Sequence, residues 1–286
     1  MRLAFLIQCH TDVELLNRFI CKVKDYLFID LYVHVDAKSS IINEIVRYEN
    51  LFIIDKRIDV KWGTFSQIEA TLELMKVACG ANKKYDYISL ISGQDYLCKS
   101  ISEIVEYLVE NKGKEFIEIC ELPKKELKYN GGIGRVSLYW PSYLTYNKSF
   151  LIKLVRNIYL QFIAVFLKKE ISSLGKLYYG SSWFTLSGEC VEFILQYLKN
   201  NPSYIKPFKS SGCGDEVFFQ TLIMNSNFKE KVVNKNLRFI RWEGDSSPIY
   251  LNENYYEEIS YSECFFVRKV STQNSLVLLD LIDNNI

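Results

Sequence analysis

The first 23 residues, MRLAFLIQCHTDVELLNRFICKV, contain a complete strand-to-helix unit. Residues 2–8 are almost continuously apolar, which predicts a strand buried on both faces. Asp12 then stands where a helix N-cap is expected. Apolar residues follow it at three- and four-residue spacing, which predicts an amphipathic helix: Leu15, Leu16, Phe19, Ile20 and Val23.

The same alternation continues over the first 120 residues. Strands are predicted at 31–36, 51–54, 85–92 and 115–119, and helices near 40–49, at 65–78 and at 101–110. Strands that alternate with helices imply right-handed crossovers and a mainly parallel sheet. The predicted fold class is therefore α/β, a Rossmann-like mixed sheet that is mainly parallel and flanked by helices.

Polar residues stand at the carboxyl ends of the predicted strands: Gln8 to His10, Asp36, Gly93 to Asp95, and Glu118. Ligands of open parallel sheets bind at this edge. The pattern therefore predicts a binding site there.

The second half is less regular. We expect a loop with a Gly-rich tip at 121–135, which lacks the G-x-G-x-x-G spacing of a dinucleotide site. Strands are predicted at 180–187, 237–242 and 264–270, and a helix at 188–199. No repeat or linker interrupts the chain, so we expect one domain over 1–286.

Residues 149–169, SFLIKLVRNIYLQFIAVFLKK, predict an amphipathic helix. Lys153 and Arg156 interrupt its apolar run, which excludes a membrane span. We expect the helix to pack on the core. The alternative is a helix lying in the interface of an anionic membrane.

Composition narrows the function classes. The chain has 286 residues, of which 49% are hydrophobic, and its net charge of +1 provides no field to recruit nucleic acid. None of the eight cysteines forms a C-x-x-C pair, so no zinc or redox motif is indicated. The N-terminal apolar run is too short for a signal peptide. We expect a cytoplasmic location, with peripheral contact at the inner membrane face as an additional expectation.

The stretch SSGCGDEVFFQTL, residues 210–222, places two acids before a helical apolar pattern. Asp215 and Glu216 fit the first turn of a helix, where acids complement the dipole, with Ser211 or Gly214 as cap. They also fit a general base directed into a cleft. The dipeptide alone leaves both interpretations open.

Seven motifs occur in a fixed order: HVDAKS (34–39), ISGQDYLCKS (91–100), EFIE (115–118), GSSWFTLSGECV (180–191), GDEVFFQTL (214–222), RFIRW (238–242) and FFVRK (265–269). Over roughly residues 30–270 the chain resembles the core-2/I-branching N-acetylglucosaminyltransferase and peptide xylosyltransferase family, glycosyltransferase family 14. The resemblance implies a GT-A fold, a nucleotide-sugar donor that is usually a UDP-sugar, inversion at the sugar carbon, and no metal cofactor. It also implies a nucleotide-binding half at 1–120 and a half at 121–286 that binds the acceptor and carries the catalytic base.

Glu216 matches the family's catalytic base. An inverting displacement needs one group to take the proton of the acceptor hydroxyl, and such a base contributes ~10²–10⁴-fold in rate. We expect the helix dipole to keep Glu216 ionised. Asp215 is then expected to cap the helix or orient its neighbour.

The resemblance also implies fixed cations where other enzymes use a metal. Asp36 and Lys38 form D-x-K, which lacks the second carboxylate of a metal-binding D-x-D pair. In a partly shielded site, one charge at 4 Å contributes roughly 4 kcal/mol. Lys269 matches a family lysine on the diphosphate. Further candidates are Arg268, which is adjacent, and Arg238 and Arg241, which do not align securely.

The resemblance assigns other residues to the donor. Asp36 is expected at the ribose or uracil, and His10, Trp62 and Ser66 near the nucleotide. Asp95 has two interpretations, contact with the donor sugar or support of a loop. His34 is expected to have a core or supporting role.

Glu118 and Trp242 match family positions that grip the acceptor sugar, since carboxylates accept hydrogen bonds from hydroxyls and aromatic faces stack on sugars. The chain departs from the family at Leu97, where a proline is usual, and at 121–175, which matches nothing. The membrane anchor, stem and disulfides of animal members are not evident, so the chain resembles a stand-alone bacterial-type catalytic domain.

The predicted function is inverting, metal-independent transfer of N-acetylglucosamine or xylose from a UDP-sugar to a glycan or lipid-linked acceptor, in bacterial surface polysaccharide synthesis. Two alternatives stay open: a metal-dependent glycosyltransferase of similar fold, and a non-catalytic sugar-binding module.

Overall fold

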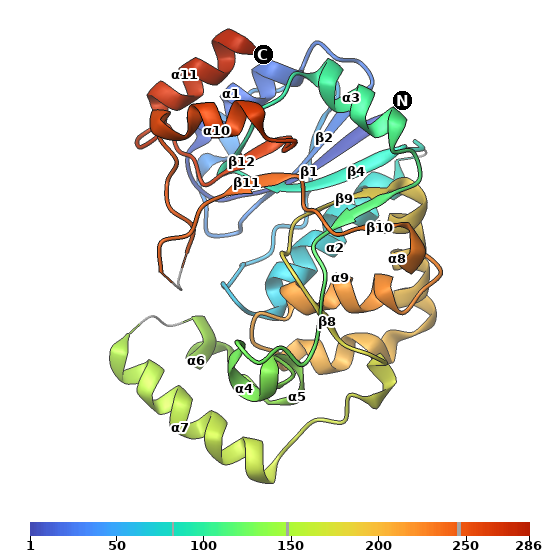
Figure 1. The fold of residues 1–286 in the computed structure, drawn as a ribbon, viewed down its shortest axis with the longest axis vertical. Coiled ribbons are helices and arrows are strands. Elements are labelled where there is room, and N and C mark those ends of the chain that lie inside the picture. The colour runs from blue at the N-terminus through green and yellow to red at the C-terminus, as the bar shows by residue number, and fades with distance from the viewer. Residues whose placement is uncertain (82, 147–148, 245–246) are drawn as a thin grey trace.

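The computed structural model describes residues 1–81, 83–146, 149–244 and 247–286, and its centre is a seven-stranded sheet (Figure 1). The strand order is β10-β6-β9-β4-β1-β2-β3. The strands are β1 (Leu3–Cys9), β2 (Ile29–Val35), β3 (Leu51–Ile53), β4 (Tyr87–Ser92), β6 (Glu115–Ile117), β9 (Phe184–Ser187) and β10 (Val232–Val233). Only β9 runs against its neighbours β4 and β6. The predicted α/β class with a mainly parallel sheet is confirmed.

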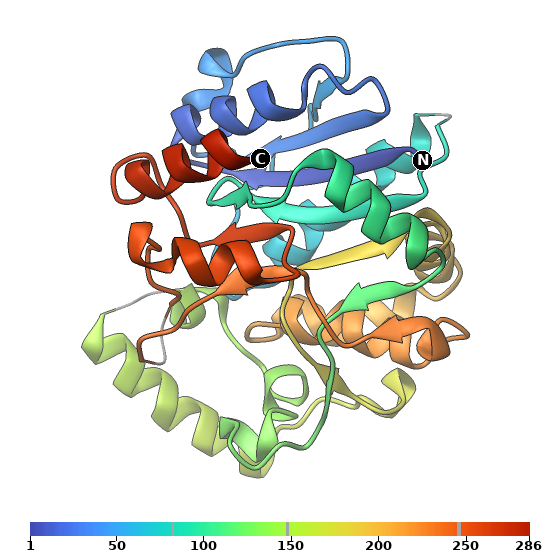
Figure 2. The same cartoon turned by 45° about the horizontal axis from the view of Figure 1, so that its top comes forward.

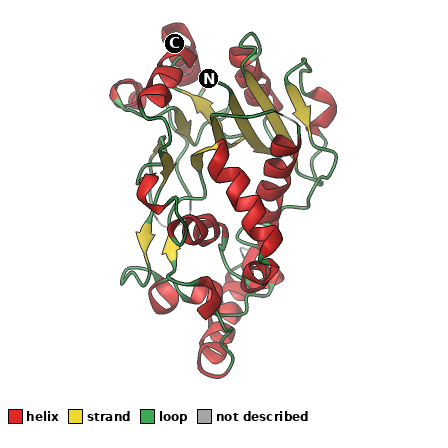
Figure 3. Cartoon of the chain, turned by 90° about the vertical axis from the view of Figure 1, so that its right-hand side faces the viewer, coloured by secondary structure: helices red, strands yellow, loops and turns green. Residues whose placement is uncertain are grey.

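Helices cover both faces of this sheet (Figure 3). Alternate residues of β1 divide between two cores, with Phe5 in one and Leu6 in the other. The first core includes α1 (Val13–Val23), α3 (Ile101–Glu110), α10 (Tyr256–Tyr261) and α11 (Leu276–Asn285). The second includes α2 (Phe65–Gly80), α8 (Gly188–Asn200) and α9 (Asp215–Met224). The predicted strand-to-helix unit at the N-terminus is thus the start of a three-layer fold.

Asp12 caps α1 as the sequence predicted. Its Oδ1 accepts a hydrogen bond from the Leu15 amide at 3.1 Å. The same carboxylate accepts from the amide and hydroxyl of Thr272, at 2.9 and 2.8 Å. The cap therefore also ties the first helix to the segment that precedes α11.

Two smaller sheets extend the structure. One has the order β11-β12-β5, formed by β11 (Arg238–Ile240), β12 (Phe266–Arg268) and β5 (Asp95–Leu97). The other pairs β7 (Cys120–Glu121) with β8 (Tyr178–Tyr179). Short 3-10 turns lie at η1 (Ile41–Glu44), η2 (Ser172–Leu174), η3 (Pro202–Ser210), η4 (Lys229–Lys231) and η5 (Glu253–Tyr255). The prediction of a helix near 40–49 is wrong, since only the short 3-10 turn η1 forms there.

The residues after β7 form a helical segment below the sheet (Figure 2). It contains α4 (Lys128–Gly131), α5 (Gly134–Ser137), α6 (Ser142–Tyr146) and α7 (Phe150–Phe166). The loop expected at 121–135 is therefore partly helical. A separate small core holds this segment together, formed by Leu138, Trp140, Leu160 and Ile163.

α7 lies along the lower left edge of the molecule in Figure 1. Only Leu160 and Ile163 of this helix are buried. The expectation that it packs on the core is wrong for most of its apolar side chains, which face outward. Among the described residues, we find no helix with the length and apolarity that crossing a membrane requires.

Candidate active site

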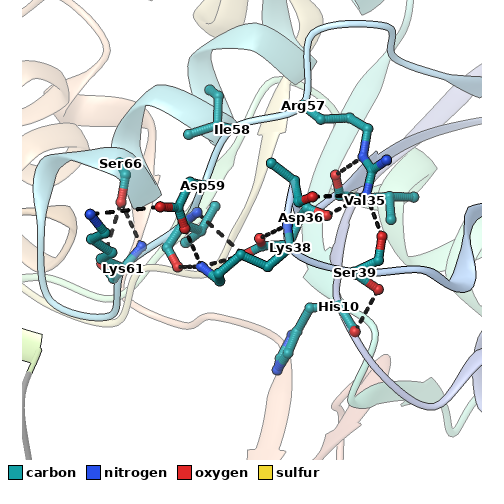
Figure 4. A network of polar contacts seen from close by, with 12 residues as sticks. His10, Val35, Asp36, Lys38, Ser39, Arg57, Ile58, Asp59, Lys61 and Ser66 are labelled. Atoms are coloured by element: carbon teal, nitrogen blue, oxygen red, sulfur yellow. Dashed lines mark hydrogen bonds and ion pairs between the residues drawn. The ribbon is translucent and has the colours of Figure 1, made fainter.

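The loop after β2 is held by a polar network at the carboxyl edge of the sheet (Figure 4). Asp36 is only 6% exposed. Its Oδ1 accepts from the Lys38 amide at 2.9 Å and its Oδ2 from the Val60 amide at 3.3 Å. The Lys38 ammonium lies 3.4 Å from Asp36 Oδ2 and donates to the Asp59 carboxylate. The D-x-K pair thus places an ammonium directly beside its one acid.

His10 marks where the strand ends converge. Its carbonyl accepts from the Ser39 hydroxyl at 2.8 Å (Figure 4). Burial lowers the pKa of the imidazole, and the charges that also act on it belong to Asp36, Lys38, Lys269 and Arg268. The ends of β1 and β2 therefore meet, as the parallel-sheet argument predicted, and the end of β12, a strand of the three-stranded sheet, lies close enough for its charges to act on His10.

His34 lies beside this edge but is buried, paired with Gln8 at the end of β2. It is 1% exposed, and its Nε2 accepts from the Ile58 amide at 2.9 Å. The ring therefore supports the chain that leads from β3 towards α2, and its burial lowers the imidazole pKa.

The turn before α2 joins the strand edge to the predicted base. Trp62 is 57% exposed, and the Ser66 hydroxyl accepts from the Lys61 amide at 2.8 Å. Gly63 has a positive φ of 73°, and its carbonyl accepts from the Cys213 amide at 2.8 Å. Cys213 precedes α9, so this turn contacts the loop that carries the two acids.

Glu216 lies in the first turn of α9 and faces a cation. Arg135 Nη1 of α5 donates to Glu216 Oε2 at 2.7 Å. The Glu216 side chain is 31% exposed. Its burial raises the pKa to about 7, although the charge of Arg135 lowers it. The expected effect of the helix dipole is thus outweighed by desolvation, and the carboxylate titrates close to neutral pH.

Asp215 has a different environment. It is 8% exposed, and its Oδ2 accepts from the Ser182 hydroxyl at 2.6 Å and from Gln67 Nε2 at 3.4 Å. Its Oδ1 has no hydrogen-bond partner among the described residues. Burial raises the pKa of Asp215. Asp215 therefore anchors α9 to two other elements, while Glu216 keeps an accessible edge.

Residues 180–183, which precede β9, connect the acids to a second cluster. The Gly180 amide donates to the Glu216 carbonyl at 2.9 Å. A Cβ on Gly180 would lie 1.8 Å from the Glu118 carbonyl oxygen, so only glycine fits. The Trp183 ring lies beneath two guanidinium groups, with Cζ of Arg268 and Arg238 at 4.6 and 5.1 Å from its centroid.

Asp95 is the centre of that cluster. Its side chain is 0% exposed. Oδ1 lies 3.0 Å from Arg268 Nη1, and Oδ2 lies 3.4 Å from Arg238 Nε. The Ser92 amide also donates to Oδ2, at 2.7 Å. Both carboxylate oxygens therefore have partners within the protein. This geometry favours the interpretation in which Asp95 supports a loop.

Arg238 and Arg268 differ in exposure. The Arg238 side chain is 1% exposed, and its Nη2 donates to the Leu90 carbonyl at 2.9 Å. Burial lowers the pKa of Arg238 to about 10. Arg268 is 15% exposed. Arg268 is consequently the member of the pair that lies nearer to solvent.

Lys269 and Arg241 lie in different surroundings. Lys269 Nζ stands 4.4 Å from the Tyr250 ring centroid, and the Tyr250 hydroxyl accepts from Gln94 at 3.2 Å. Arg241 instead pairs with Glu258 on the surface, where its side chain is 45% exposed. The structure thus brings Lys269 to the strand edge and leaves Arg241 outside it.

Glu118 and Trp242, the two predicted acceptor residues, lie at opposite ends of β11. Glu118 Oε2 accepts from Asn236 Nδ2 at 3.0 Å. Glu118 and Asn236 line a cavity of about 370 Å³ beside Arg238, and Trp242 is not part of its lining. Trp242 is 58% exposed and forms an isolated bridge with Pro248. An exposed indole and a carboxylate are suited to contact with a sugar.

Several residues of this site escaped the sequence argument. Ser182 and Trp183 lie inside the motif GSSWFTLS, which was a signal without an assigned role. Arg135 lies in the segment that matched no family motif, so nothing in the sequence marked it. Within the described ranges, no three Cys, His, Asp or Glu side chains are grouped as metal ligands.

Comparisons with known proteins show which family this chain is similar to. The model of the family described as "Core-2/I-Branching enzyme" matches residues 3–265. A human N-acetyllactosaminide beta-1,6-N-acetylglucosaminyl-transferase is 24% identical over 251 residues, which cover 84% of this chain and 58% of the relative. Xylosyltransferase 2 of Rattus norvegicus is 23% identical over 252 residues, covering 85% and 27%.

The chain thus spans between about a quarter and three fifths of these two relatives. Among solved structures, HddC from Yersinia pseudotuberculosis is 12% identical with a TM-score of 0.31, covering 68% of this chain and 80% of that chain. A likeness this low carries no argument.

Proposed function

Because the chain belongs to the Core-2/I-Branching enzyme family, whose curated relatives are named N-acetylglucosaminyl- and xylosyltransferases, we propose that it is a glycosyltransferase. It moves N-acetylglucosamine or xylose from a UDP-sugar to a hydroxyl of a glycan or glycolipid. The observation that carries the proposal is the geometry of Glu216, a partly exposed carboxylate in the first turn of α9 with the Arg135 guanidinium 2.7 Å away.

The reaction we propose is a single in-line displacement with inversion. Glu216 takes the proton of the acceptor hydroxyl, whose oxygen forms a bond to the sugar C1. The bond between C1 and the β-phosphate oxygen breaks at the same time, and its electron pair stays on UDP. A carboxylate with a pKa near neutrality suits this role, because it is ionised at pH 7.5 and still basic.

Fixed cations stabilise the departing diphosphate in this proposal. Arg268 and Lys269 follow one another at the end of β12, and both act electrostatically on His10, as does Lys38. Preorganised charges of this kind favour the transition state without reorganisation at the moment of reaction. The ammonium of Lys38, 3.4 Å from Asp36, occupies the neighbourhood where a metal-dependent enzyme needs a second acid.

Release of UDP in the presence and absence of EDTA tests this arrangement. UDP-N-acetylglucosamine and UDP-xylose are supplied with a panel of sugar acceptors, and liberated UDP is measured. We expect the same rate with and without EDTA. Loss of activity in EDTA, restored by Mn²⁺, would instead establish the metal-dependent alternative.

Binding of the donor is checked separately by thermal unfolding. A ligand that binds only the folded state stabilises it by about 2.7 kcal/mol at a hundred times its Kd. We expect UDP to raise the midpoint without added metal, and UMP to raise it less because it lacks the β-phosphate. No shift with any UDP compound would contradict the proposed donor.

The pH profile depends on the contact between Arg135 and Glu216. A general base works only when unprotonated, so we expect kcat/KM to rise with pH through about 7, the pKa of Glu216. Arg135 lowers that pKa. Arg135→Met should therefore move the rising limb to higher pH, whereas Arg135→Lys, which keeps the charge, should leave it nearer the original position. Identical limbs in all three proteins would contradict this assignment.

The acceptor class is also part of the proposal. We propose a glycan or lipid-linked acceptor used in bacterial surface polysaccharide synthesis. Support comes from the exposed apolar helix α7, whose segment also carries Arg135 to the base.

A further inference from the structure

The outer face of α7 is a continuous apolar surface. Eight large apolar side chains of this helix are exposed: Phe150, Leu151, Leu154, Val155, Ile158, Phe162, Val165 and Phe166. With 3.6 residues per turn, they occupy an arc of roughly 160°. Gln161 is the one other residue of the helix within that arc. Exposed apolar residues of a soluble protein are normally scattered, and a grouped set marks an interaction surface.

The opposite face of α7 is already engaged by this chain. Leu160 and Ile163 pack with Leu138 and Trp140. The Tyr129 hydroxyl donates to Asn157 at 3.2 Å. These contacts fix the helix and direct its apolar arc outward, so another molecule must cover that arc if it is to be buried.

The charge of the segment around α7 indicates which kind of molecule covers its apolar arc. From residue 121 to 176 the chain has ten Lys and Arg and three acids, while the whole chain has a net charge of only +1. No acid occurs between residues 149 and 169. Lys153 of α7 and Lys168 just after it are exposed. A positive segment that presents apolar side chains matches the interface of an anionic bilayer.

We propose that α7 is a membrane-docking helix that lies in the interface of an anionic bilayer, with the eight apolar side chains inserted among the acyl chains. The proposal goes beyond the transfer reaction and does not depend on it. A second copy of the chain is the poorer occupant, since two-fold packing of α7 on α7 would bring two positive segments together.

The docking surface and Arg135, the cation beside the base, lie on one segment. Leu138, which directly follows α5, packs in the same small core as Leu160 and Ile163 of α7. In α5 itself, Arg135 donates to Glu216 at 2.7 Å.

Flotation of the full chain with lipid vesicles tests the proposal. We expect co-flotation with vesicles that contain phosphatidylglycerol, weak binding to vesicles of phosphatidylcholine alone, and release by high salt because surface charges are screened. Phe162→Gln with Val165→Gln should reduce binding by about tenfold or more, since two inserted apolar groups are lost. Leu27→Gln with Val109→Gln, two apolar side chains exposed elsewhere, should leave binding unchanged.

A charge variant supports the same conclusion independently. Lys153→Glu with Lys168→Glu keeps the apolar arc and should weaken binding only to the anionic vesicles. Thermal unfolding midpoints and the rate of UDP-sugar hydrolysis in the absence of vesicles should match the parent in every variant. Vesicle binding that survives both double variants would overturn the proposal. So would a concentration-dependent dimer, seen by analytical ultracentrifugation, that the Phe162→Gln, Val165→Gln variant abolishes.

Discussion

Glu216→Gln should lower turnover by at least about 100-fold. Glutamine keeps the size of the side chain and its ability to accept a hydrogen bond from Arg135, but the amide cannot take a proton from the acceptor. The thermal shift with UDP should be retained, since the substitution leaves the strand edge and its cations intact. Steady-state kinetics with saturating donor measures the turnover, and thermal unfolding with UDP measures donor binding, so the two expected effects are recorded separately.

Glu189→Gln is the matched control for this experiment. Glu189 is also an acid in the first turn of a helix, at the start of α8, and it is exposed. If Glu216 only complements a helix dipole, the two substitutions should have equally small effects. A loss of turnover in Glu216→Gln no greater than that of the control would therefore contradict its role as base.

Asp95→Ala should destabilise the fold by about 3–5 kcal/mol, because it leaves buried charges without a partner. The Asp95 side chain is 0% exposed and Arg238 is 1% exposed. Both guanidinium groups near Asp95 rest on Trp183, so water cannot replace the carboxylate. Urea unfolding without ligand measures this effect apart from any contact with the donor.

A double variant separates the ion pair from simple loss of packing. Asp95→Ala with Arg238→Met removes the most buried unpaired charge and should recover part of the lost stability. Glu258→Ala is the control, since its pair with Arg241 is half exposed and such pairs contribute little. An unfolding midpoint for Asp95→Ala equal to that of the control would show that the two arginines are solvated.

Local patterns predicted the elements where apolar spacing and burial agree. The β1–α1 unit formed with its cap at Asp12. The helix expected near 40–49 failed because contacts from another element decide that backbone. Asn17 accepts from the Val46 amide at 2.9 Å and donates to the Glu44 carbonyl at 2.9 Å, which ends the turn after η1. A single-sequence pattern contains no information on such a contact.

α7 shows a second limit of the pattern. The apolar residues of α7 cover much of its circumference. The sequence therefore predicted that the helix exists but not which side of it would face the protein. The small core formed with Leu138 and Trp140 decides that orientation, and it depends on residues that had no recognisable pattern.

The site itself was predictable where the chain brings residues to a strand end. Asp36 and His10 follow strands of the parallel sheet, whose topology gathers them, whereas Lys269 follows β12 of the separate three-stranded sheet. Arg135 reaches Glu216 only through the path of an irregular segment. The raised pKa of Glu216 likewise depends on burial, which the sequence does not give.

The tetrapeptide from Gly180 to Trp183 connects the proposed base with the proposed cations of the leaving-group site. One end is bonded to the backbone of Glu216, and the other supports the guanidinium of Arg268. The three peptide bonds between Gly180 and Trp183 therefore set how far the proton acceptor stands from the charges that receive the leaving group. One inserted residue would lengthen this tetrapeptide by up to ~3.3–3.6 Å. A misplacement of the reacting groups by about 1 Å already costs ~10²-fold in rate. Evolution of acceptor range in this protein is accordingly expected to proceed by changing surrounding loops while the length of this tetrapeptide stays constant.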